Sequence, residues 1–492
     1  MSHAVTRYHA LYESMRTRRR KPAVHKGLDA PWAHAAMKLR HRRITRAWLR
    51  DQAERIDAMA PASRALSDRA LDDSIAALRA TFRRGRQDEQ AVRRAFAAVR
   101  EVARRETGQE AFVVQLMGAL ALYHGRIVEM VTGEGKTLTG SLAAPLLAWR
   151  HRSVHVFTVN DYLAARDAES RRPIYDRCGC PVGAITQQME PRERFGVYAR
   201  PIVYGTPKQI TADYLRDQLR LGPLDSAWAG RRLLGARAPD GTSAGPMIPG
   251  LRCAIVDEAD AVLIDEGVVP LIIARARRED DMSRAYREAH QAATRLDETA
   301  DYTIDPVKRR AEITRRGRHR IHEITAQLSD PVWRAHRRGE ELVRQALVAI
   351  HCYKRGHQYE VVDGRVVIVD EFTGRFLPDR SWEHGLHQAV EAKEEIEVTA
   401  DRETLARLSF QRFFRTYPFL CGMTGTAAAA ALEMERVYER PVTIIPTNRP
   451  LIRERWPTRV FRDGETRWDA VAESIEDVTA QGRPVLVGTR SI

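Results

Sequence analysis

The sequence predicts an α/β protein in which a parallel sheet is covered by helices, and two observations predict it. From Phe112 onward, short runs of β-branched and apolar residues alternate with segments of helical periodicity. The alternation stops after Pro270, where a charged stretch begins, and it resumes near Leu420. Strands that alternate with helices form parallel sheets, because each crossover needs a long connection. We therefore expect one α/β domain that is interrupted by an insert.

The length and composition are those of a protein with several apolar cores. The chain has 492 residues, 43% hydrophobic and 29% charged, so we expect two to four domains. Its longest apolar stretches, Leu116–Tyr123 and Leu142–Trp149, are far shorter than the ~20 residues that span a bilayer. The first twenty residues carry scattered arginines and no apolar region, so no secretory signal is predicted. We expect a cytoplasmic protein whose membrane contact is peripheral.

Charge and cysteine content narrow the classes of partner and of metal site. The net charge of +15 favours anionic partners, but charge alone does not distinguish nucleic acid from acidic lipid headgroups or acidic proteins. Cys178 and Cys180 are the only close pair among five cysteines, and no histidine cluster accompanies them. Because a structural zinc ion needs four ligands, we expect no zinc site.

The expected elements follow one another along the chain. Residues 1–45 predict a basic arm, and residues 46–107 are rich in Ala, Arg, Leu and Glu with helical periodicity. Residues 275–355 are charged and mostly helical, and a strand pattern returns at Tyr359–Val369. Strands of the main sheet are expected at Arg126–Val131, Val154–Val159, Pro201–Tyr204, Leu251–Val256, Leu420–Thr424, Val442–Ile445 and Val485–Val487.

A glycine-rich loop between a predicted strand and an apolar helix is the strongest local signal. Its sequence is Thr132-Gly-Glu-Gly-Lys-Thr137, and glycines allow consecutive backbone N–H groups to point at phosphate oxygens. The helix N-terminus adds its dipole at the same place. Lys136 would reach the β- and γ-phosphates, and the Thr137 hydroxyl would hold Mg²⁺. Met130 replaces the first glycine of the strict P-loop pattern, a position that helicase-like ATPases relax.

A second signal is an acidic run that directly follows an apolar strand. Leu251–Val256 leads into Asp257-Glu-Ala-Asp260. Ligands of open parallel sheets bind beyond the carboxyl ends of the strands. Asp257 would therefore interact with Mg²⁺ through water, and Glu258 would be the base that orients the attacking water. An acidic helix N-terminus has a similar sequence, but the phosphate loop upstream favours a nucleotide site.

Two further segments are candidate parts of the same site. Gln115 precedes the loop and could read the adenine edge through its amide, although an isolated glutamine there is more often an ordinary helix residue. Gly422–Thr426 follows a short strand and could couple loss of the γ-phosphate to movement. Taken alone, that segment would be a Gly/Thr turn.

Together these blocks resemble one family, the SecA preprotein translocase motor ATPases. Glu129–Thr139 is similar to the SecA Walker A segment, and Asp257–Asp260 with Leu263–Glu266 is similar to its Walker B block. The resemblance runs from about residue 45 to the last residue. Further blocks typical of the family are Val154–Ala164, Arg166–Glu169, Pro270–Ile273, Val367–Glu371, Thr373–Arg375, Gly385–Glu394, Gly422–Ala427, Pro446–Pro450 and Pro484–Thr489.

The resemblance implies a RecA-like P-loop domain of the DEAD-helicase type, with a parallel sheet covered by helices. This first nucleotide-binding domain would span residues 46–270 and resume at 380–438. A mainly helical or mixed preprotein cross-linking domain, which clamps the translocating chain, would be the insert 271–379. Residues 439–492 would begin a second RecA-like domain, and ATP would sit between the two RecA-like domains.

The resemblance also implies a function, which is an ATP-driven motor of the Sec translocase that moves unfolded preproteins through the SecY channel. The expected cofactors are ATP and Mg²⁺. The expected partners are the SecY complex, preproteins and acidic phospholipids, with a homodimer left open and nucleic acid not expected. The protein would act at the cytoplasmic face of the inner membrane. Residues that match the family's nucleotide site are Gln115, Thr132, Gly133, Glu134, Gly135, Lys136, Thr137, Asp257 and Glu258.

Departures from the family pattern leave two alternatives open. The later helicase motifs, which supply arginine fingers, are not found in these 492 residues, and residues 228–250 resemble an insertion before the Walker B strand. Loss of an arginine finger can lower the rate by ~10³–10⁵. One alternative is therefore an ATP-binding or regulatory protein with little turnover. The other is a nucleic-acid helicase, which is less favoured because the insert ahead of Gly422 is typical of protein motors.

Overall fold

A computed structural model describes most of the chain. The described residues are 27, 29–221, 246–276, 282–326, 328, 331–369, 376–377, 380–383, 385–399 and 402–488. Contacts divide the chain into two compact units, of which the first comprises Met1–Ile273 and Thr404–Ile452 and the second Ala274–Glu403 and Arg453–Ile492. The assignment of these segments to two nucleotide-binding domains and a cross-linking domain stays a prediction.

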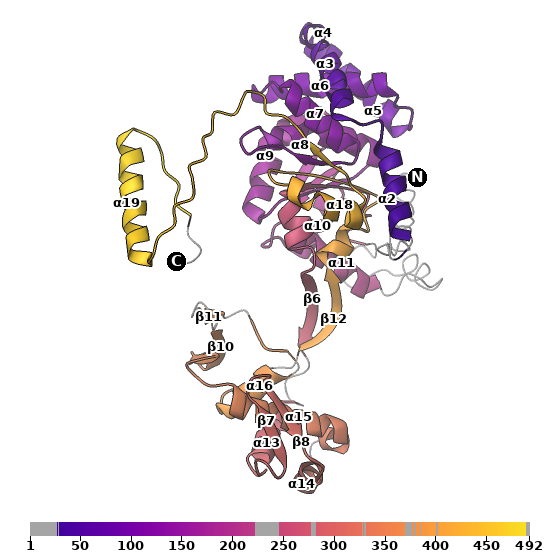
Figure 1. The fold of residues 1–492 in the computed structure, drawn as a ribbon. Coiled ribbons are helices and arrows are strands. Elements are labelled where there is room, and N and C mark those ends of the chain that lie inside the picture. The colour runs from indigo at the N-terminus through magenta and orange to yellow at the C-terminus, as the bar shows by residue number, and fades with distance from the viewer. Residues whose placement is uncertain are drawn as a thin grey trace. The chain divides into compact units, whose positions relative to one another are not determined.

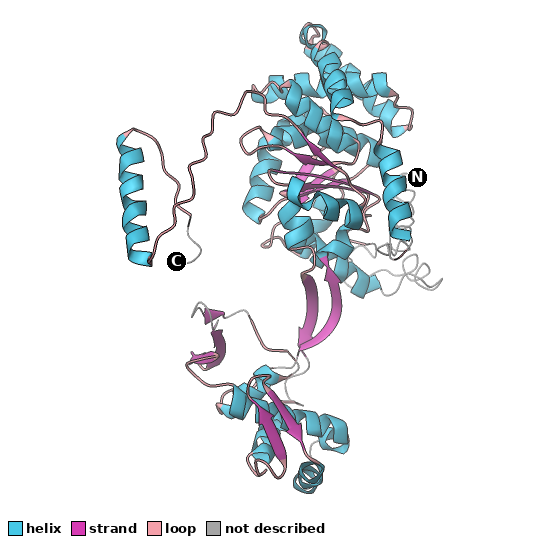
Figure 2. Cartoon of the chain, in the orientation of Figure 1, coloured by secondary structure: helices cyan, strands magenta, loops and turns pink. Residues whose placement is uncertain are grey.

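A seven-stranded sheet lies at the centre of the described part of the first unit (Figures 1 and 2). Its strand order is β14-β1-β13-β5-β2-β4-β3, and all neighbouring strands are parallel. Met423 at the end of β13 lies opposite Asp257 at the end of β5. The strands are β1 (Ile127–Glu129), β2 (Val154–Phe157), β3 (Val182–Ala184), β4 (Ile202–Gly205), β5 (Cys253–Asp257), β13 (Phe419–Thr424) and β14 (Val442–Ile444).

Both faces of the sheet are buried, as continuous apolar strands require. Along β5, Cys253 and Ile255 pack into one hydrophobic cluster, and Ala254 and Val256 pack into another. The predicted parallel sheet covered by helices is therefore confirmed. Helices on the first face include α3 (Arg46–Asp57), α5 (Asp68–Arg83), α6 (Glu89–Thr107), α7 (Val113–Tyr123), α8 (Lys136–His151) and α9 (Asp161–Arg177). Elements on the other face include α10 (Pro191–Tyr198), α11 (Pro207–Leu221), η1 (Ala261–Asp265), α17 (Phe410–Phe414) and α18 (Ala431–Tyr438).

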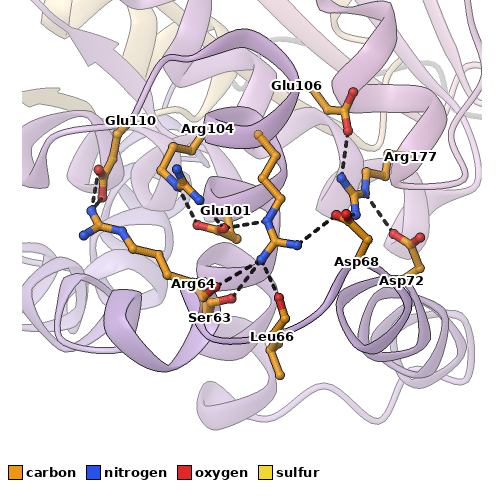
Figure 3. Close-up of polar contacts among 11 residues, drawn as sticks. Ser63, Arg64, Leu66, Asp68, Asp72, Glu101, Arg104, Glu106, Glu110 and Arg177 are labelled. Carbon is orange, nitrogen blue, oxygen red and sulfur yellow. Dashed lines mark hydrogen bonds and ion pairs between the residues drawn. The ribbon is translucent and has the colours of Figure 1, made fainter.

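Ion pairs join the helices that cover the first face (Figure 3). Arg177 on α9 bonds Asp68 and Asp72 on α5, and it also bonds Glu106 on α6. Arg105 bonds the buried Glu101 one turn away, and it also reaches Asp68. The short helix α4 (Ala60–Arg64) joins through a pair between Arg64 and Glu110. Because Arg177 contacts two other helices, it fixes the position of α9 within this layer.

The N-terminal region contains a described helix, α2 (Asp29–His41), although the sequence predicted only a basic arm over residues 1–45. Met37 and His41 of α2 are buried, and the helix contacts α18. Thr45 caps α3 by accepting a hydrogen bond from the Trp48 N–H. The predicted insertion at residues 228–250 lies mostly outside the described residues.

The insert has a core of its own, built around Tyr286, Leu347 and Tyr359. Strands β6 (Pro270–Ala276) and β12 (Arg402–Ser409) pair where the chain leaves the first unit and returns to it. The charged stretch contains an antiparallel pair, β7 (Tyr302–Asp305) with β8 (Arg310–Ile313), that the helical pattern did not predict. The other elements are α13 (Ser283–Ala293), α14 (Arg315–Thr325), η2 (Pro331–Arg334), α15 (His336–Cys352), β9 (Tyr359–Val362), β10 (Arg365–Val369), β11 (Phe376–Leu377) and α16 (Leu386–Lys393).

The last described stretch contains helix α19 (Gly464–Ala480). The strand predicted at Val485–Val487 is wrong for this structure, because these residues are assigned to no strand and Leu486 is 98% exposed. An extended segment becomes a strand only when a neighbouring strand takes its backbone hydrogen bonds. Among the described residues, no helix is both long and apolar enough to cross a membrane.

Candidate active site

The glycine-rich loop lies at the carboxyl end of β1 and leads into α8. Gly133 and Gly135 have φ values of 93° and 84°, left-handed conformations that glycine adopts without a side-chain clash. Helix α8 begins at Lys136, so the unpaired N–H groups of its first turn and its positive dipole lie at this edge of the sheet. This is the arrangement that binds phosphate in many proteins.

Gln115 on α7 is buried against the loop and is only 6% exposed. Its Nε2 donates to the Glu134 carbonyl at 2.9 Å, and its Oε1 accepts from the Phe112 N–H at 3.0 Å. A side chain at Gly135 would collide with the Gln115 amide. Gln115 therefore supports the loop directly, and only glycine fits at position 135.

Lys136 and Glu258 bring the two predicted motifs together. The Lys136 Nζ lies 3.3 Å from Glu258 Oε1, and the lysine side chain is 12% exposed. Glu258 has a φ of 48°, which is uncommon for a residue with a side chain. Backbone strain of this kind is concentrated at functional sites. The strained position places the Glu258 carboxylate next to the lysine of the loop.

Asp257 ends β5 in a half-buried position. Burial, together with the neighbouring charge of Glu258, raises the pKa of this carboxyl from 3.8 to about 6. The Glu258 N–H donates to Asp257 Oδ1 at 3.1 Å, and that bond together with the charge of Lys136 opposes the rise. An ionised Asp257 is thus costly in the isolated protein, and a cation at this edge would reduce that cost.

Two threonines, one at the end of β13 and one in the turn that follows it, contact the acidic run. The Thr424 hydroxyl donates to Asp260 Oδ1 at 2.6 Å and lies 3.4 Å from Glu258 Oε2. The Thr426 hydroxyl bonds the other oxygen of Asp260. Burial opposes ionisation of Asp260, but the bonds from both threonines outweigh it and lower its pKa. Asp260 therefore links the end of β13 to the end of β5 through hydrogen bonds.

The same turn approaches the phosphate loop from the other side. Gly425 lies close to the loop, since a side chain there would come within 3.3 Å of Thr132 Oγ1 and 3.8 Å of Lys136 Nζ. Glu129 at the end of β1 accepts a hydrogen bond from the Ala428 N–H at 2.5 Å. The loop, the acidic run and the Gly/Thr turn thus occupy one site at the carboxyl edge of three adjacent strands.

The comparison with protein families agrees with this geometry. Residues 34–435 match the model of the SecA DEAD-like domain, which covers more than half of the chain. The chain belongs to the SecA family. That assignment confirms the resemblance and, with the observed sheet, the predicted fold class.

Individual relatives support the same family. The chain is 39% identical over 485 residues to "Protein translocase subunit SecA 2" of Chlorobium chlorochromatii, covering 96% of this chain and 72% of the relative. It is 40% identical to the protein of that name from Magnetococcus marinus, covering 95% and 71%. It is 39% identical to "Protein translocase subunit SecA" of Chromohalobacter salexigens, covering 90% of this chain but 48% of the relative. Compared with that longer SecA, the chain spans about half the length.

The structure brings nearly all the predicted SecA site residues to one edge of the sheet. The six residues of the loop lie between β1 and α8, Gln115 contacts the loop, and Glu258 pairs with Lys136. Asp257 lies beside them at the end of β5. Thr137 lies in the first turn of α8. The family blocks at Asp370–Glu371 and Thr373–Arg375 fall outside the described residues.

Sequence reasoning missed several contacts of this site. The sequence pattern indicates Thr424 and Thr426 only as part of a possible coupling element, and it predicts no role for Asp260. The Asn448 N–H donates to Glu134 Oε2 at 3.0 Å, which joins the loop to the Pro446–Pro450 block. Short-range patterns give no sign of these bonds. The available signal was that all the segments follow predicted strands, whose carboxyl ends meet at one edge.

Proposed function

We propose that this SecA-family protein hydrolyses ATP and uses the energy to move unfolded preproteins through the SecY channel. The observation that supports hydrolysis best is the pair between Lys136 of the phosphate loop and Glu258 of the acidic run. It combines a phosphate-binding cation with a carboxylate able to orient water. The relatives named as protein translocase subunits support the transport role.

In the proposed site, the loop holds the phosphates of ATP. Backbone N–H groups of residues 133–137 would surround the β-phosphate, and Lys136 would bind the β- and γ-phosphates. Gln115, which lies beside the loop, would bind the adenine edge through its side-chain amide. Its present bond to the Glu134 carbonyl means that an adenine contact would share or replace that interaction.

The available oxygen ligands also fit Mg²⁺. Magnesium bound to a nucleotide usually takes one or two protein oxygens and keeps several waters, so a large cluster of acidic ligands is not required. The described residues contain no group of three or more His, Cys, Asp or Glu arranged around a metal. Thr137 would supply a hydroxyl, and Asp257 would interact through water. The ion would neutralise charge on the phosphates. It would also favour the ionised form of Asp257, whose pKa is raised.

Glu258 would act as the base for hydrolysis. In the structure its carboxylate is paired with Lys136. When phosphates attract Lys136, Glu258 is released to accept a hydrogen bond from a water molecule and orient it toward the γ-phosphate. The Thr424 hydroxyl, 3.4 Å from Glu258 Oε2, would then respond to the change in Glu258. Loss of the γ-phosphate would in this way change the contacts of β13 and of the turn that follows it.

We also propose the partners that the family implies. They are the SecY channel complex, unfolded preproteins and acidic phospholipids at the cytoplasmic face of the inner membrane. The net charge of +15 supports attraction to an anionic membrane surface.

Steady-state ATP hydrolysis by the purified chain tests the proposed ATPase activity. The Glu258→Gln variant should bind ATP and lose turnover by about 10²–10⁴-fold.

Matched variants make this test specific. Lys136→Ala should weaken nucleotide binding, whereas Glu54→Gln, which changes an exposed carboxylate on α3 outside the site, should leave turnover unchanged. Binding without turnover in the wild type would instead support a nucleotide-holding protein. Transport is measured separately, by protease protection of a preprotein in vesicles that contain the SecY complex. Turnover without protection would refute the transport role but not the ATPase.

A further inference from the structure

A second group of basic residues lies at the opposite, amino-terminal edge of the same sheet. Arg126 immediately precedes β1, and Arg440 lies two residues before β14. These two strands are neighbours and run in parallel, so the two arginines enter the sheet at the same edge. Arg40 and His41 at the end of α2 complete the group. We call Arg40, His41, Arg126 and Arg440 the basal cluster.

The basal cluster contains buried polar atoms that have no hydrogen-bond partner. His41 is only 8% exposed, and neither of its ring nitrogens is bonded. The Nε of Arg440 is also buried and without a partner. Unsatisfied buried polar atoms are rare in folded proteins, because each costs about 1–3 kcal/mol. The ring nitrogens of His41 and the Nε of Arg440 are therefore available to bond a ligand.

The charges around His41 indicate the sign of the charge that a ligand of this cluster would carry. Burial, together with the positive charges of Arg126, Arg440 and Arg40, lowers the pKa of His41 to about 4. Burial likewise lowers the pKa of Arg440, on which Arg40 also acts. The carboxylates that influence the arginines are Glu435, which lies 3.7 Å from His34, and Glu439. A site with this excess of positive charge attracts an anion.

The two half-buried arginines, Arg126 and Arg440, are held in place by contacts within the protein. Arg126 donates from Nε to Thr443 Oγ1 at 2.5 Å and from Nη1 to the Ile44 carbonyl at 2.7 Å. Arg440 donates to the Pro418 carbonyl at 3.4 Å, and its guanidinium lies 5.9 Å from the centre of the Phe419 ring. Groups that are already ordered lose little entropy when they bind a ligand.

A glycine lies directly against the same guanidinium. Gly125 has a φ of 75°, and a side chain there would approach Arg440 Nη1 to 3.3 Å. The backbone at Gly125 therefore passes close to the arginine. Arg40 is exposed, which leaves the cluster in contact with solvent on one side.

We propose that the basal cluster binds a phosphate group. A phosphate carries up to two negative charges and several acceptor oxygens, so it can meet guanidinium and imidazole donors that come from different elements. A carboxylate carries one charge and two oxygens, and it would satisfy fewer of these donors. The group could belong to inorganic phosphate or to a phosphorylated lipid headgroup, since both present the same chemistry. The proposal does not depend on ATP hydrolysis at the carboxyl edge.

Calorimetric titration of inorganic phosphate into the full chain tests the proposal. Saturating ADP is present throughout so that the glycine-rich loop is occupied, and the titration is repeated in Lys136→Ala without ADP. We expect one phosphate site under both conditions. Arg440→Gln should weaken it by about tenfold to a hundredfold, the loss that corresponds to one hydrogen bond to a charged group. Arg40→Gln, a change at an exposed side chain that should not affect folding, should weaken it as well.

Controls and a second arm distinguish the sources of the phosphate group. Arg94→Gln removes one exposed arginine from α6 and should leave binding unchanged. Flotation with phosphatidylcholine vesicles, with and without phosphatidic acid, identifies a headgroup if only the acidic vesicles bind and Arg440→Gln abolishes that binding. Phosphate binding without vesicle binding identifies a soluble ligand. The proposal is wrong if neither probe binds, or if Arg94→Gln weakens binding as much as Arg440→Gln does.

Discussion

Replacing Asp257 by asparagine should stabilise the nucleotide-free protein at neutral pH. The rise of the Asp257 pKa from 3.8 to about 6 means that the folded state holds the proton more tightly than the unfolded chain. Below pH 3.8 the carboxyl is protonated in both states, and no stability is lost. As the pH rises through 3.8 to 6, the unfolded chain releases its proton first, so the folded state loses stability. Above pH 6 the full cost remains.

The size of that cost follows from the same values. A rise from 3.8 to about 6 corresponds to at most about 3 kcal/mol of unfolding free energy, at 1.36 kcal/mol for each pH unit. Asparagine keeps an oxygen that can accept the Glu258 N–H, but it carries no charge. The Asp257→Asn variant should therefore be more stable than the wild type by about 1–3 kcal/mol at pH 8, and equally stable near pH 3.5.

Urea unfolding of both proteins between pH 3.5 and pH 8 measures this difference. Asp265→Asn, at an exposed position in the same segment, is the matched control and should show no comparable gain. A gain that does not change with pH would refute the electrostatic explanation, because packing effects of the substitution do not titrate. If Asp257 interacts with Mg²⁺ as proposed, saturating MgADP should stabilise the wild type more than the variant.

Three further predictions concern the loop, the turn and the helical layer. Gly135→Ala should lower the unfolding free energy in urea by about 1–3 kcal/mol more than Gly133→Ala, because both glycines have positive φ but only position 135 meets Gln115. Equal losses would mean that backbone strain alone acts. Thr424→Val should retain ATP binding and lower turnover about tenfold, since it leaves Asp260 and Glu258 without the hydroxyl; unchanged turnover would exclude the coupling role. Arg177→Ala should cost about 1 kcal/mol of thermal stability at low salt and less at high salt, and a salt-independent loss would indicate lost packing instead.

The parts of the site that the sequence predicted well are those specified by a few adjacent residues. The loop 132–137 needs glycine for its positive φ values and a following helix, and both features are visible in a short window. The same is true of Asp257, which directly follows an apolar strand. In each case local chemistry and local chain direction are sufficient, and no distant contact is needed.

The parts that the sequence could not predict depend on which strands lie side by side. Thr424 reaches Asp260 only because β13 pairs with β5, and 164 residues separate the two side chains. The antiparallel pair β7–β8 was missed because each strand has four residues and a charged pattern. The strand predicted at Val485–Val487 was wrong because its apolar pattern has no described partner strand. Pairing over long distances is not encoded in a local pattern.

The carboxyl end of β5 holds two unfavourable features that would be costly without a ligand. Asp257 is ionised at neutral pH only against its raised pKa, and Glu258 adopts a strained backbone conformation with a φ of 48°. A bound nucleotide and its cation would act on both residues. Phosphate would compete with Glu258 for Lys136, and a cation would favour the ionised form of Asp257. A ligand that binds only the folded protein raises its free energy of unfolding. The stabilisation by MgADP should therefore decrease in Asp257→Asn even where the contacts of the phosphate loop are unchanged.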